Sequence, residues 1–78
     1  MLGEELRRAR LAAAWSQEEL AERAGISRNY VSLLELNRKS PTIDTLLAIC
    51  SALEISAADV IRRVERSPSN RRRASGGS

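Results

Sequence analysis

Histidine is absent from the chain, cysteine occurs once, and only two of the 78 residues are aromatic. Without histidine and with a single thiol, at Cys50, the chain has neither a Cys/His zinc site nor an internal disulfide. It also lacks a Gly-rich phosphate loop and a convergent pair of carboxylates, on which phosphate-binding and acid–base enzymes depend. We therefore predict that the protein is not an enzyme and uses no metal, cofactor or small-molecule ligand.

Long apolar segments are absent as well. No run approaches the roughly 20 apolar residues that span a bilayer, and the N-terminus has no apolar signal-peptide core. The sequence thus predicts a cytoplasmic location and no membrane partner. With Trp15 and Tyr30 as the only aromatic residues, the core must consist of Leu, Ile, Val and Ala, and Cys50 is interpreted as a small buried hydrophobe.

The positive charge is concentrated at one end. Lys and Arg number 13 against 10 Asp and Glu, for a net charge of +3, and three of the arginines are residues 71–73. The composition changes at Ser67 to SPSNRRRASGGS, which predicts a disordered basic tail over 67–78 after a folded domain over 1–66. The folded part then has no net charge, so binding to nucleic acid requires a polarised face.

The stretch QEELAERAGISRNYVSLLEL, residues 17–36, contains two short helical patterns separated by a glycine. Ser16 and Ser27 stand where the two helices would begin, and serine is a preferred N-cap. Gly25 follows the first pattern, where a residue without Cβ adopts the left-handed conformation at least cost. The helices must cross closely, and small Ala21 is placed to meet Val31. This spacing is typical of a helix-turn-helix.

Three further helices are expected from apolar residues at helical spacing, over about 3–14, 42–53 and 56–66. The predicted fold class is therefore all-α. It has five helices, with the helix-turn-helix formed by the second and third.

Two charged residues fall on the apolar sides of their helices. Arg10 lies four residues after Leu6, and Glu35 lies four residues after Val31, so both are turned toward the core. An unpaired buried charge is costly, and we therefore predict an ion pair between Arg10 and Glu35. The alternative is two separately solvated side chains, since long charged side chains reach water easily.

The helix-turn-helix stretch resembles that of the phage-repressor family, also called Cro/CI or XRE. The positions that match its pattern are Ala21, Gly25, Ile26, Val31 and Leu34. The resemblance continues through NRKSPTIDTLLAICSALEI and covers about residues 4–65. It implies a five-helix, lambda-repressor-like DNA-binding domain and the same Arg10–Glu35 pair. Within the family, the run SRNYVSLLE is most similar to small restriction–modification controller proteins.

In a helix-turn-helix the second helix, here about 27–36, lies in the major groove of DNA and reads bases. The predicted base-reading residues are Ser27, Arg28, Asn29, Ser32 and Leu33. Arginine pairs with guanine, asparagine with adenine, serine with a base or phosphate, and leucine with a thymine methyl. For Leu33, the alternative is packing within the domain or against another subunit.

A second set of polar residues flanks this helix and is predicted to bind phosphates. Its members are Ser16, Gln17, Tyr30, Asn37, Arg38 and Lys39. The N-terminus of the second helix favours an anion, and the family resemblance implies a phosphate contact by Gln17. Asn37 stands where the family usually has glycine. Such contacts position a protein on DNA without specifying sequence.

One such domain touches few base pairs, so a dimer is expected, with its two reading helices about 34 Å apart on an inverted repeat. The last helix and its preceding turn supply the predicted interface: Ile55, Val60, Ile61 and Val64. We thus predict a dimeric, sequence-specific transcriptional regulator of double-stranded DNA. Two alternatives remain: an antitoxin that also binds a toxin, and a purely protein-interaction module, in which Arg28 and Asn29 would be dispensable.

Overall fold

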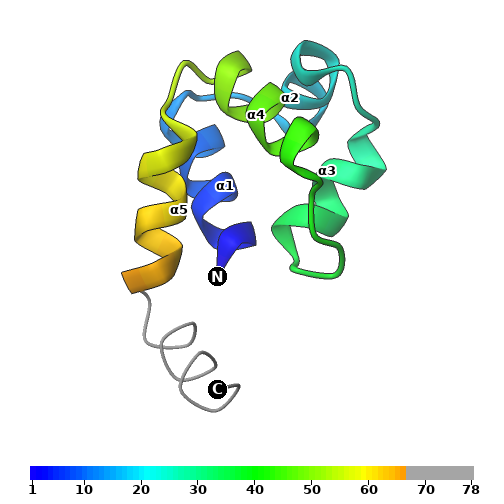
Figure 1. The fold of residues 1–78 in the computed structure, drawn as a ribbon. Coiled ribbons are helices and arrows are strands. Elements are labelled where there is room, and N and C mark those ends of the chain that lie inside the picture. Colours follow the sequence, from blue (N-terminus) through cyan, green and yellow to red (C-terminus); the bar gives the residue numbers. More distant parts are fainter. Residues whose placement is uncertain (67–78) are drawn as a thin grey trace.

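A computed structural model describes residues 1–66, and this part of the chain forms five helices without strands (Figure 1). They are α1 (Leu2–Ala12), α2 (Gln17–Ala24), α3 (Arg28–Glu35), α4 (Ile43–Ala52) and α5 (Ala57–Arg66). The all-α prediction is confirmed, with helix ends within two residues of those expected. The predicted tail over 67–78 lies outside the described residues. None of the five helices is long and apolar enough to cross a membrane.

Local hydrogen bonds define where the helices begin. The hydroxyl oxygens of Ser16, Ser27 and Thr42 each accept the backbone N–H three residues later, at 3.0–3.1 Å. Ser56 makes the same contact at 3.3 Å. Each hydroxyl satisfies an amide that has no partner within the helix. The starts of α2 to α5 are therefore encoded locally, as the sequence indicated.

Within residues 1–66, α1 to α4 are each followed by a residue in the left-handed backbone conformation, and only one of these residues is glycine. Gly25 ends α2 with a φ of 73°, as predicted. Ala14, Asn37 and Glu54, which follow α1, α3 and α4, also have positive φ values of 61°, 59° and 56°. Residues with a Cβ adopt this conformation at a cost of about 1–2 kcal/mol. The turns after α1 and α4 are thus less favourable than they would be with glycine.

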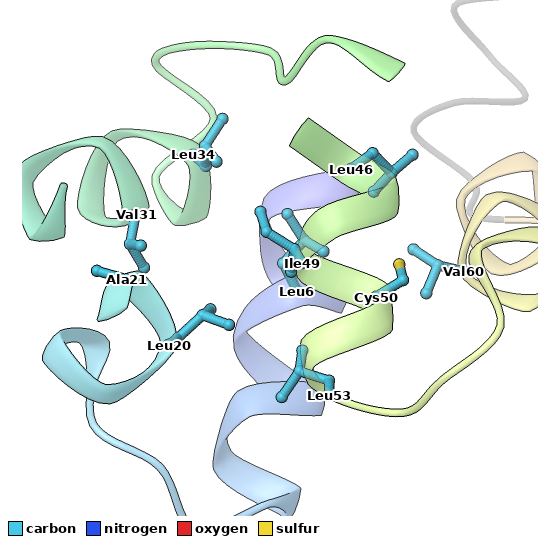
Figure 2. Packing of buried hydrophobic residues seen from close by; sticks show 10 residues of the cluster. All are labelled: Leu6, Leu20, Ala21, Val31, Leu34, Leu46, Ile49, Cys50, Leu53 and Val60. Carbon is cyan, nitrogen blue, oxygen red and sulfur yellow. The ribbon is translucent and has the colours of Figure 1, made fainter. Parts of the chain in front are cut away.

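The core lies around α4, which packs against α2 and α5 (Figure 2). Its buried apolar residues are Leu6, Leu20, Ala21, Val31, Leu34, Leu46, Ile49, Cys50, Leu53 and Val60. The predicted meeting of Ala21 and Val31 is visible where α2 crosses α3. Cys50 is buried as expected, and this burial raises the pKa of its thiol.

The burial of Val60 contradicts its predicted place in a dimer interface. Its side chain is only 3% exposed and points toward Cys50, so it anchors α5 to the core (Figure 2). The assignment of Val60 to a dimer interface is therefore wrong, because a side chain this deeply buried offers no surface to a partner. The helical pattern of α5 was correct, but it did not reveal which apolar residues face inward.

A buried ion pair joins α1 to α3. Arg10 donates from Nε to Glu35 Oε2 at 2.7 Å and from Nη2 to Glu35 Oε1 at 3.0 Å. The residues are 8% and 7% exposed, which contradicts the alternative of separate solvation. A third donor of Arg10, Nη1, bonds the carbonyl oxygen of Trp15 at 2.7 Å. The hydrogen bonds to Glu35 raise the pKa of Arg10, against the opposing effect of burial.

The start of α1 lies directly against the end of α3. A Cβ added to Gly3 would be 2.5 Å from the carbonyl oxygen of Leu34 and 2.6 Å from that of Glu35. The Gly3 N–H donates to Asn37 Oδ1 at 2.9 Å, and Asn37 Nδ2 donates to Glu4 Oε1 at 2.7 Å. The positive end of one helix thus meets the negative end of another, at a distance only glycine allows.

Replacing Glu35 with alanine should lower the free energy of unfolding by about 3–5 kcal/mol, because the guanidinium of Arg10 would stay buried without its partner. Urea denaturation followed by circular dichroism measures this loss. Glu22→Ala, at an exposed position on α2, serves as the control and should stay within about 0.5 kcal/mol of the parent. Equal stability of the parent and the Glu35 variant would contradict a structural role for the pair.

Replacing Gly3 with alanine should destabilise the protein by about 1–3 kcal/mol, the usual cost of inserting a methyl group into filled space. Alanine is the better helix former, so propensity alone predicts the opposite sign. Thermal unfolding distinguishes the two, with Arg7→Ala on the exposed side of α1 as the control. A raised melting temperature for the Gly3 variant would show that α1 and α3 do not approach closely.

Candidate nucleic-acid interface

The turn between α2 and α3 is short and tightly bonded. The N–H of Ile26 donates to the carbonyl oxygen of Ala21 at 2.9 Å, which closes the end of α2 around Gly25. Ser27 then begins α3 as its N-cap. The inward face of α3 carries Val31, Leu34 and Glu35, all buried. With that face fixed, the opposite side and the N-terminal end of α3 point away from the core.

The N-terminal end of α3 presents three polar residues to solvent. Ser27, Arg28 and Asn29 are all exposed, although the Ser27 oxygen is already used as the cap. No ion pair holds Arg28 within residues 1–66. The guanidinium and the Asn29 amide are therefore available to hydrogen-bond an external group. This is the chemistry expected of a helix that reads base edges.

One turn further on, the predicted reading residues are less accessible. Ser32 and Leu33 are both half-buried. The chain after α3 turns back toward the backbone of Leu33. The N–H groups of Arg38 and Lys39 both donate to the Leu33 carbonyl oxygen, at 2.9 and 3.3 Å.

The residues of the turn after α3 have two different roles, although the sequence analysis placed all three among the phosphate contacts. The side chains of Arg38 and Lys39 are exposed and carry positive charge beside the end of α3. Asn37 instead directs both polar atoms of its side chain at α1, through its bonds to Gly3 and Glu4. Asn37 therefore secures α1 against α3, a role that no pattern in the sequence indicated.

The start of α2 forms the other edge of the surface. Ser16 caps the helix, and Gln17, in its first turn, is half-buried and donates from Nε2 to Glu35 Oε1 at 3.1 Å. Tyr30 is half-buried, with its ring packed against the core. The bond from Gln17 to Glu35 was not predicted. The spacing placed Glu35 near Arg10, but nothing in the chain indicated a third partner.

Charge is distributed unevenly around these elements. Glu18, Glu19 and Glu22 on α2 are exposed carboxylates, while Arg28 and the turn after α3 are basic. Arg23 lies over the ring of Trp15, 4.6 Å from its centroid, and so acts within the domain. The described residues contain no group of three or more His, Cys, Asp or Glu side chains arranged to hold a metal ion. The polar groups exposed around α3 are hydrogen-bond donors suited to an anionic polymer.

Comparison with known proteins agrees with this geometry. A family model described as helix-turn-helix matches residues 6–60. An uncharacterised HTH-type transcriptional regulator of Sinorhizobium fredii, y4dJ, is 32% identical over 68 residues, covering 87% of this chain and 88% of the relative.

Two solved structures are similar in fold. The master regulator for biofilm formation SinR, in complex with DNA, has a TM-score of 0.75, with 31% identity over 78% of this chain and 98% of that one. The restriction–modification controller C.AhdI from Aeromonas hydrophila has a TM-score of 0.74, with 32% identity over 76% of this chain and 89% of that one.

Several curated relatives are longer than this chain, which covers 54% of the ClgR regulator of Mycobacterium tuberculosis. The matched part is the five-helix unit described above. It carries the helix-turn-helix formed by α2 and α3, and the family model spans more than half of the chain. The chain belongs to the XRE-type helix-turn-helix family and is a transcriptional regulator with a helix-turn-helix DNA-binding domain.

Proposed function

We propose that the protein regulates transcription as a homodimer that binds an inverted-repeat operator, with α3 in the major groove of each half-site. The observation that carries this proposal is the position of Arg28, which is exposed and has no ion pair within the part of the chain that the structure describes. It lies beside Asn29 at the start of α3, whose opposite face is buried in the core. Arg28 pairs with the O6 and N7 atoms of guanine, and Asn29 with the N6 and N7 atoms of adenine. Ser27 and Ser32 supply hydroxyl groups, and the half-buried Leu33 offers an apolar edge.

Phosphate contacts on both sides of α3 would position the domain. Arg38 and Lys39 approach one strand from the turn after α3, and Ser16 and Gln17 approach the other from the start of α2. Tyr30 offers its hydroxyl between them. Asn37 is left out of this set, because its side chain is already bonded to α1. The structure of SinR in complex with DNA, at 31% identity, supports the assignment of DNA as the partner.

The dimer contact is assigned to α5 and the turn before it. Ile61 is 43% exposed, and Ile55 and Val64 are half-buried. A groove of about 330 Å³ lies between α1 and α5, with apolar Ala9, Ala12 and Ile55 in its lining and Arg8, Ser56, Asp59 and Arg63 also bordering it. A second copy would cover the apolar side chains of α5 and of this groove, since exposed apolar side chains gain most from burial.

Selection of bound sequences from a random DNA pool, at physiological salt, tests sequence reading and dimerisation together. We expect enrichment of an inverted repeat whose half-sites are about one helical turn, roughly 10 base pairs, apart. Recovery of no consensus would contradict the proposal. It would favour a protein-binding role instead, for which a co-purifying partner would be sought.

The same selection with Arg28→Ala should lose base preference at one position in each half-site, and affinity should fall by about 1–3 kcal/mol. Arg7→Ala, which removes an exposed positive charge from α1, is the matched control and should leave the consensus unchanged. An identical consensus for the parent and the Arg28 variant would refute a base-reading role for this residue.

Replacing Ile61 with glutamate should abolish dimerisation while leaving the monomer folded, because the side chain is exposed in the monomer and would be buried between copies. Sedimentation equilibrium measures the association, and circular dichroism verifies the fold. Ala58→Glu, at another exposed position on α5, tests whether any added charge on this helix has the same effect. A dimer that survives Ile61→Glu would place the interface elsewhere.

A further inference from the structure

The carboxylate of Glu35 accepts three hydrogen bonds from two different helices. Two come from Arg10 on α1, and the third comes from Gln17 Nε2 at the start of α2, at 3.1 Å. Glu35 itself lies on α3 and is almost entirely buried. A single buried carboxylate therefore links the helix proposed to read bases to a side chain proposed to bind phosphate.

This bond determines which way the Gln17 amide faces. A carboxylate paired with a guanidinium only accepts hydrogen bonds, so the amide must present its nitrogen rather than its oxygen. The nitrogen carries two hydrogens, of which Glu35 takes one. The other remains for an acceptor outside the domain, because Gln17 is only half-buried. The amide is thereby held as a donor before any ligand arrives.

A fixed hydrogen-bond donor matters at the start of α2 because the carboxylates nearby repel a phosphate. Glu18 and Glu19 in the first turn of α2, and Glu22 in the second, are exposed carboxylates. Ser16 already uses the N–H of Glu19, so fewer backbone donors remain at the helix start. A phosphate would thus be bound by a few neutral donors aimed at it and not by general attraction.

We propose that Glu35 is a positioning residue for DNA binding: its carboxylate fixes the Gln17 amide so that the second N–H donates to a backbone phosphate. This inference rests on the proposed function, since it assumes that the start of α2 approaches DNA. Glu35 does not touch the DNA. It acts through Gln17 and, by way of Arg10, ties that donor to the position of α1.

A double-mutant cycle tests the coupling. Gln17→Met keeps the length of the side chain but removes the donor, and Arg10→Met with Glu35→Leu replaces the buried pair by apolar side chains, a change that buried pairs often tolerate. Affinity for the selected operator is measured by fluorescence anisotropy at fixed salt. In the parent, Gln17→Met should weaken binding about tenfold, as expected for a lost hydrogen bond to a charged group.

In the Arg10→Met, Glu35→Leu background, Gln17→Met should have almost no further effect on operator affinity, because Glu35 no longer orients the Gln17 amide. Lys39→Ala is the matched control, since Lys39 takes no part in the buried network and should cost the same in both backgrounds. A full tenfold loss from Gln17→Met in the altered background, or no loss in the parent, would overturn the inference. Failure of the parent to select any operator would instead overturn the proposed function.

A second measurement needs no variant and so does not depend on the altered core folding. Gln17 is the only glutamine in the chain, so its side-chain NH₂ resonances are readily assigned. Restricted rotation about the amide C–N bond keeps the two protons distinct in any glutamine, so the test is where each resonates. In the free protein the proton bonded to Glu35 should be displaced from the shift of a solvent-exposed glutamine amide. On adding operator DNA, the other proton should move most. Two protons at the shifts of a solvent-exposed glutamine, or no change with DNA, would contradict the proposal.

Discussion

The arrangement of the helices depends on the buried pair of Arg10 and Glu35. It joins α1 to α3, and its further bonds reach the Trp15 carbonyl oxygen and the amide of Gln17. Removing two charges from water costs several kcal/mol, so such a pair adds little net stability over apolar residues of the same volume. Its contribution is directional, because a planar guanidinium satisfies its partners in few orientations, whereas aliphatic side chains slide and rotate.

This directional constraint matters because the core is small and, apart from Cys50, its buried residues are aliphatic. A core of Leu, Ile, Val and Ala tolerates alternative packing and does not by itself fix the angle of a short helix. In this protein the C-terminal end of α3 is held at two points, by Glu35 to Arg10 and by Asn37 to Gly3. The N-terminal end, with Arg28, is left projecting into solvent. Fixing one end of α3 is therefore what allows the other end to be exposed and still well placed.

The features that the sequence predicted are those encoded by neighbouring residues. The caps Ser16 and Ser27 and the turn at Gly25 depend on spacings of a few positions, and the five helices follow from apolar periodicity. The Arg10–Glu35 pair was also predictable, since two buried charges of opposite sign need each other. The roles of Gly3 and Asn37, and the burial of Val60, depend on how helices distant in sequence approach one another. No local pattern records that distance.

The balance of charge indicates which groups must supply the affinity for DNA. Residues 1–66 hold ten basic and ten acidic groups, once the three arginines at 71–73 are set aside from the total of 13. Without net charge, these residues have no general attraction for random DNA, and counterion release comes only from the few basic side chains that meet phosphates. Exposed Glu18 and Glu22 on α2 repel phosphates near the proposed phosphate contacts. Affinity must then come from a few donors at fixed positions, so discrimination between operator and random DNA depends on how rigidly the core holds them.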